Sequence, residues 1–161
     1  MTKFLLTVHV LAAIVAIGPV TVAASMFPPA ARRALASPGD PRAAETVRLL
    51  HRICRVYAVL GVVVPVFGFA TASSMGVLGD AWLIVSIALT ALAALVLVAL
   101  VLPRQSALLE AADGDGEGGE GGGGGPRAAT VRLAMVTGVF NLLWAAVTVL
   151  MIVRPGSTTG A

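Results

Sequence analysis

Residues 81–102 read AWLIVSIALTALAALVLVALVL, an unbroken apolar run without a single charged side chain. A helix needs about 20 such residues to cross the hydrocarbon core of a bilayer. Backbone N–H and C=O groups find no water inside lipid, so a run of this length favours a helix, whose polar groups bond internally. The stretch therefore predicts a transmembrane helix, and with it an integral membrane protein.

The composition supports the same class. Of the 161 residues, 58% are hydrophobic and only 12% are charged, and the mean hydropathy is +0.95. A soluble domain carries roughly 25% charged residues. The formal charge of +3 comes from arginines that flank apolar runs, which indicates an orientation signal and no nucleic-acid partner. The only cysteine, Cys54, excludes an intrachain disulfide and a CxxC motif.

Three further apolar runs, at residues 4–26, 53–73 and 133–153, are also long enough to cross a bilayer. Together with residues 81–102 they predict an all-α fold, a four-helix transmembrane bundle that forms a single domain over residues 1–161. The lipid bilayer is then the first partner of the chain.

The connections between these runs differ. Residues 74–80 are few enough that the second and third spans should form an antiparallel hairpin. Residues 27–50 predict a Pro- and Arg-rich loop with a short amphipathic helix over residues 43–50. Residues 111–127 contain DGDGEGGEGGGGG, which has almost nothing to bury and predicts a flexible linker.

Basic residues indicate the orientation. Lys3 and Arg154 lie at one side of the predicted bundle, and nine arginines lie at the other. These nine are Arg32, Arg33, Arg42, Arg48, Arg52, Arg55, Arg104, Arg127 and Arg132. Loops rich in Lys and Arg remain in the cytoplasm, so we expect a multi-pass protein of the plasma membrane with both termini extracytoplasmic.

A secretory signal peptide is the alternative for the first run, because VAAS at residues 22–25 is an acceptable cleavage pattern. Cleavage would send the arginine-rich segment that follows to the outside. The run is also longer than the usual apolar region of a signal peptide, about 7–15 residues. Both facts favour a retained helix.

His9 is the candidate site residue. It lies about six residues into the first span, and Ala12, Ala13 and Ala16 share its helical face. Small residues let another helix approach closely, so His9 should face the bundle. An ionisable residue inside a span is a functional hypothesis by default. The alternative is a neutral histidine that bonds to a neighbouring helix or to interfacial water.

Other polar residues fall at related depths. Thr71, Ser86 and Thr148 should lie level with His9, and Asn141 should lie deeper, near the midplane. Helix packing accounts for hydroxyl side chains at such positions. The amide of Asn141 needs hydrogen-bond partners, which interhelical bonding would supply.

Arg48, His51, Arg52 and Arg55 form a basic band where the second span enters the membrane from the cytoplasm. Anionic lipid headgroups are the natural partner of such a band, and the alternative is an orientation signal alone. His51 and His9 should be separated by most of the membrane thickness, so one haem cannot take both as axial ligands.

The sequence contains no Walker motif, no nucleophile–base pair and no carboxylate within a span. A metal site would have to use His9 as the ligand of haem iron or copper. For copper it would be joined only by scattered methionines such as Met75 or Met151.

The first span and its exit carry a resemblance. Residues 4–34, FLLTVHVLAAIVAIGPVTVAASMFPPAARRA, contain an early histidine, a glycine about nine residues later and a proline–basic exit. This pattern resembles a bacterial family of predicted four-helix integral membrane proteins of unknown function. That family is distantly similar to copper-resistance D-type and HemJ-type membrane proteins.

The resemblance implies a b-type haem with His9 as an axial ligand. The HemJ-type pattern also uses a lysine in a later helix, whereas Lys3 is the only lysine of this chain. The additional histidines of the copper-resistance type are missing as well.

We therefore expect an integral membrane protein without enzymatic activity of its own, an accessory or assembly component. A homodimer or a larger membrane complex is the expected assembly. The alternative is a haem- or porphyrin-binding membrane redox protein with His9 as axial ligand.

Overall fold

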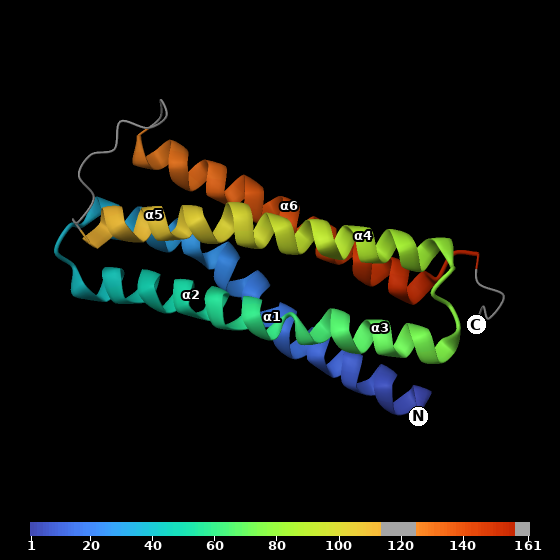
Figure 1. The fold of residues 1–161 in the computed structure, drawn as a ribbon. Coiled ribbons are helices and arrows are strands. Elements are labelled where there is room, and N and C mark those ends of the chain that lie inside the picture. Colours follow the sequence, from blue (N-terminus) through green and yellow to red (C-terminus); the bar gives the residue numbers. More distant parts are fainter. Residues whose placement is uncertain (114–124, 157–161) are drawn as a thin grey trace.

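The chain forms a bundle of long helices in the computed structural model, which describes residues 1–113 and 125–156 (Figure 1). The elements are α1 (Thr2–Ala36), α2 (Pro41–Leu60), α3 (Val63–Met75), α4 (Ala81–Leu95), the π-helical η1 (Val96–Val101), α5 (Leu102–Asp113) and α6 (Pro126–Val153). No strand occurs among the described residues. Four stretches are long and apolar enough to span a membrane: Thr2–Ala36, Pro41–Met75, Ala81–Asp113 and Pro126–Val153. The predicted all-α class with four membrane-capable helices is confirmed.

The helices are longer than the predicted spans. The 35 residues of α1 rise about 52 Å, against a hydrocarbon core of about 30 Å. The α1 helix is therefore longer than the hydrocarbon core is thick. Of the predicted linker over residues 111–127, both ends are helical, and residues 114–124 lie outside the described part of the chain.

The connection between α1 and α2 differs most from expectation. Instead of a loop over residues 27–50, only residues 37–40 interrupt the helices. The α1 helix continues through Pro28 and Pro29 because this part of α1 is packed, with Phe27 and Ala31 fully buried. The α2 helix begins at once, since the Asp40 side chain accepts a hydrogen bond from the Arg42 N–H at 3.0 Å.

The bundle is built around α1. The α2 and α3 helices pack along it, α6 packs on both α1 and α4, and α3 packs chiefly on α1. The start of α1, the end of α6 and the α3–α4 turn lie at one end of the bundle (Figure 1). The α1–α2 turn lies at the opposite end, with the end of α5 and the start of α6 (Figure 1). We call this opposite end the basic end, because the nine arginines lie in its half.

Prolines distort the middle of two spans. Pro65 cannot donate to Gly61, and its ring clashes with that carbonyl, so the helix opens at Gly61–Val62 between α2 and α3. Pro103 has the same effect on the carbonyl of Ala99, and the helix widens to the π form in η1 just before it. Such irregular backbone is tolerated at membrane depth only inside protein or beside a cavity.

At the other end, Trp82 joins α4 to α6. Its Nε1–H donates to Asp80 Oδ2 at 3.0 Å, and the Arg154 guanidinium carbon lies 5.7 Å from the Trp82 ring centroid. Tryptophan is favoured where lipid meets water, so this contact fits a membrane boundary.

Candidate functional site

His9 bonds to the backbone of α3. Its Nδ1 lies 2.9 Å from the carbonyl oxygen of Val64. A carbonyl oxygen only accepts, so Nδ1 carries the hydrogen. In the neutral ring, Nε2 then holds the lone pair that a metal ion would need.

Gly68 makes room for that ring. A Cβ on Gly68 would lie 2.8 Å from Cε1 and 3.1 Å from Nδ1 of His9. The imidazole therefore rests directly on the α3 backbone, between two helices, as the small-residue face of α1 predicts. A backbone bond of this kind fixes both the tautomer and the direction of Nε2.

The hydroxyl groups expected at the level of His9 do not form a network with it. Thr71, Ser86, Thr90 and Thr148 each donate to the carbonyl four residues earlier in their own helix, at 2.7–2.9 Å. Their hydrogen bonds are therefore local, and the site around His9 consists of α1 and α3 groups.

The α6 helix carries a row of polar groups at the spacing of one helical face. Asn141 Nδ2 donates to Ser25 Oγ on α1 at 3.0 Å. Three buried atoms of this row have no hydrogen-bond partner in the described part of the chain: Thr137 Oγ1, Asn141 Oδ1 and Trp144 Nε1. The predicted need of Asn141 for an interhelical partner is met for its nitrogen and not for its oxygen.

A second polar cluster lies near the basic end. His51 Nδ1 donates to Gln105 Oε1 at 3.2 Å, and Gln105 Nε2 donates to Cys54 Sγ at 3.5 Å. Gln105 and Cys54 are fully buried and His51 is 9% exposed. The Phe27 ring packs edge-on against His51, with centroids 6.5 Å apart.

The sequence did not predict Gln105 as a buried residue, because it follows the end of the predicted third span at residue 102. Val101, Gln105 and Leu108 have the spacing of one helical face, and all three are buried. This periodicity could have predicted that Gln105 is buried. The position of this cluster also shows that His51 lies far from His9. Phe27, which touches His51, lies 18 residues after His9 on α1, a rise of about 27 Å.

The predicted basic band is divided by the structure. His51 turns inward to Gln105, whereas Arg52 and Arg55 are exposed. A surface groove of about 490 Å³ lies along α2 and is lined by His51, Arg52, Arg55, Val56 and Val59. The structure thus places two exposed guanidinium groups and one buried imidazole along the same groove.

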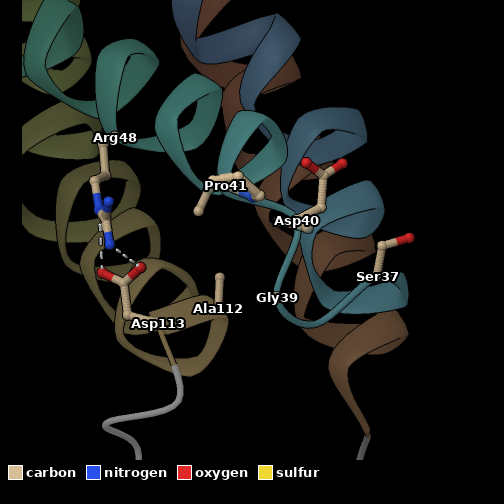
Figure 2. Close-up of a pocket in the computed structure, with 9 residues that line it drawn as sticks. Ser37, Gly39, Asp40, Pro41, Arg48, Ala112 and Asp113 are labelled. Atoms are coloured by element: carbon tan, nitrogen blue, oxygen red, sulfur yellow. Dashed lines mark hydrogen bonds and ion pairs between the residues drawn. The ribbon is translucent and has the colours of Figure 1, made fainter.

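Arg48 has a different partner. Its Nη2 lies 2.6 Å from Oδ1 of Asp113 at the end of α5, and its Nε lies 3.4 Å from Oδ2 (Figure 2). The pair borders a small pocket of about 280 Å³ that the α1–α2 turn closes with Ser37 and Asp40. Because Arg48 is engaged with Asp113, it serves as a link between α2 and α5.

Within residues 1–113 and 125–156, no three His, Cys, Asp or Glu side chains gather closely enough to hold a metal ion.

The family model described as "Predicted integral membrane protein (DUF2269)" matches residues 3–155. The chain belongs to this family. The match covers all four membrane-capable helices, which agrees with the resemblance to a membrane family of unknown function. No curated protein and no solved structure matches the chain significantly.

Proposed function

We propose that this member of the family is an accessory or assembly component of the membrane, without catalytic activity of its own. The observation that carries the proposal is the Asn141–Ser25 hydrogen bond between α6 and α1. Ser25 is exposed on the bundle, and Asn141 is only partly buried. The Asn141–Ser25 pair thus lies at the outer surface of the bundle, where the hydrocarbon core of the bilayer would contact it.

A polar pair in this position favours a further helix. Asparagine and serine side chains bond across membrane helices, and their interactions are worth roughly 0.6–2 kcal/mol each. Asn141 Oδ1 is buried inside the bundle, so a second helix against this face would bond to the exposed Ser25 side chain. A second copy of this chain is the simplest such partner, and it would present the same pair.

The experiment compares wild-type protein with an Asn141→Leu variant. Thr148→Val is the matched control, because Thr148 is also exposed on α6 but bonds to its own helix. Cross-linking in native membranes should show about a threefold to thirtyfold loss of complex in Asn141→Leu and none in the control. Equal cross-linking of Asn141→Leu and wild type would overturn the proposal.

A second candidate is haem or porphyrin binding at His9, and the Nδ1 bond to Val64 is what favours it. That bond leaves Nε2 unprotonated, as a candidate iron ligand. His51 lies at the other end of the bundle, so within the described residues His9 is the one histidine that would hold a haem here. A second copy of the chain would have to supply the other ligand.

A bound haem would provide one-electron redox chemistry at this end of the bundle. The test is the absorption spectrum of the purified protein with and without added haemin. We expect a Soret band that His9→Ala abolishes and His51→Ala retains. No band under either condition would rule out this function.

The basic end is proposed to face the cytoplasm of a cell whose plasma membrane holds the bundle. Support comes from the arginine count, because positive residues mark the cytoplasmic side. Both the start of α1 and the end of α6 would then lie outside.

A further inference from the structure

We propose that the groove on α2 binds one anionic phospholipid of the cytoplasmic leaflet. Its phosphate would lie between Arg52 and Arg55, and an acyl chain would follow Val56 and Val59. The proposal rests on the orientation proposed above and is independent of the accessory role. Five residues line the groove: His51, Arg52, Arg55, Val56 and Val59.

Charge is the first argument for a lipid occupant. Arg52 and Arg55 lie three residues apart and so share one face of α2; both are exposed, and neither has an acidic partner in the described residues. Arg48, one turn earlier, is neutralised by Asp113. The groove therefore carries the exposed positive charge of two neighbouring arginines, Arg52 and Arg55.

The buried wall of the groove supplies the second argument. His51 is 9% exposed, and its Nδ1 is committed to Gln105. Only Nε2 is left to bond to an occupant, and no described residue bonds to it. A polar atom at the wall of a groove that two arginines also line favours a ligand with a polar headgroup.

The direction of the groove gives the third argument. One turn beyond the arginines, Val56 and Val59 are 48% and 73% exposed. Exposed apolar residues therefore follow the two arginines of the groove, at the level where the predicted second span enters the bilayer. A phospholipid has the same sequence of groups, a charged phosphate followed by hydrocarbon, and polybasic sites next to a span attract such lipids.

The experiment measures lipid retained by the purified full-length protein in native mass spectrometry. The probes are phosphatidylglycerol and phosphatidylcholine of equal chain length. Wild type should prefer phosphatidylglycerol, and Arg52→Gln and Arg55→Gln should each lower that retention about fivefold. Arg42→Gln is the matched control, because Arg42 is exposed on α2 outside the groove, and it should retain the lipid like wild type.

A second variant tests the apolar half without changing any charge. Val59→Trp fills the groove and should reduce retention of both lipids. Circular dichroism of every variant should match wild type, which separates loss of the site from loss of the fold.

Two results would overturn the proposal. One is unchanged phosphatidylglycerol retention when both Arg52 and Arg55 are replaced by glutamine. The other is equal competition by soluble glycerophosphoglycerol, because a headgroup without acyl chains would then suffice and the groove would be a simple anion site.

Discussion

The imidazole of His9 rests on Gly68, so closely that a Cβ at position 68 would lie 2.8 Å from Cε1 of the ring. Two carbon atoms that are not bonded to each other do not come that close, so any other residue at position 68 must displace His9 or separate α1 from α3. The same ring donates to the Val64 carbonyl. The two contacts hold one polar group against one helix backbone inside a membrane-capable bundle.

Gly68→Ala should therefore destabilise the protein through this one contact. Overpacking costs about 1–3 kcal/mol, and the loss should be seen as a lower midpoint of thermal unfolding in detergent. Gly138→Ala is the matched control, because a Cβ at this α6 position meets nothing within 4 Å. That variant should be neutral or slightly stabilising.

The double variant His9→Ala with Gly68→Ala tests the cause. Removing the ring gives the new Cβ room, so the double variant should lose less stability than the sum of the two single changes. Strict additivity of the two changes would argue against direct contact.

Gln105→Leu should destabilise the protein, because it breaks the buried polar cluster near the basic end. The change leaves the Nδ1–H of His51 without its acceptor in a site where Gln105 is fully buried. An unpaired buried donor costs about 1–3 kcal/mol, which thermal unfolding in detergent would measure.

The paired variant His51→Phe with Gln105→Leu removes donor and acceptor together. It should recover most of the lost stability, because replacing both partners by apolar groups is close to neutral. A double variant as unstable as Gln105→Leu alone would show that shape, and not hydrogen bonding, decides this site.

Hydropathy was sufficient to predict the number of membrane-capable helices, because an uncharged run such as residues 81–102 has few alternatives in lipid. It could not place the helix ends. The residues after Met26 look like a loop because Pro28 and Pro29 disfavour helix. The burial of Phe27 and Ala31 depends on neighbouring helices, as in the contact of Phe27 with His51 of α2, and no local pattern reveals such contacts.

The candidate sites could also be predicted only in part from the sequence. The alanine face next to His9 predicted that it turns toward another helix, since periodicity along one helix carries that information. The partner atom, a Val64 carbonyl, carries no side-chain signal at all. His51 resembled its arginine neighbours in sequence, and only the position of Gln105 on α5 shows that it points inward.

Orientation can be measured with engineered cysteines in a Cys54→Ala background. Ser37→Cys lies in the exposed α1–α2 turn, and Gly79→Cys lies in the α3–α4 turn at the other end. A membrane-impermeant thiol reagent should label Gly79→Cys in intact cells and Ser37→Cys only after permeabilisation, because arginine-rich ends remain in the cytoplasm. The reverse pattern would invert the proposed orientation and with it the leaflet assigned to the lipid groove.

The Arg48–Asp113 pair offers a test of how the basic end is held together. The two side chains are 56% and 22% exposed, so solvent screens their attraction and a coupling of about 0.2–1 kcal/mol is expected. Thermal unfolding of Arg48→Gln, Asp113→Asn and the double variant gives that coupling as a double-mutant cycle. Because exposed charges are screened by salt, the coupling should shrink when the ionic strength is raised from about 0.01 M to about 1 M. A coupling that salt leaves unchanged would mean that the pair acts through the packing of α2 on α5, and its charges would then not be what joins these helices.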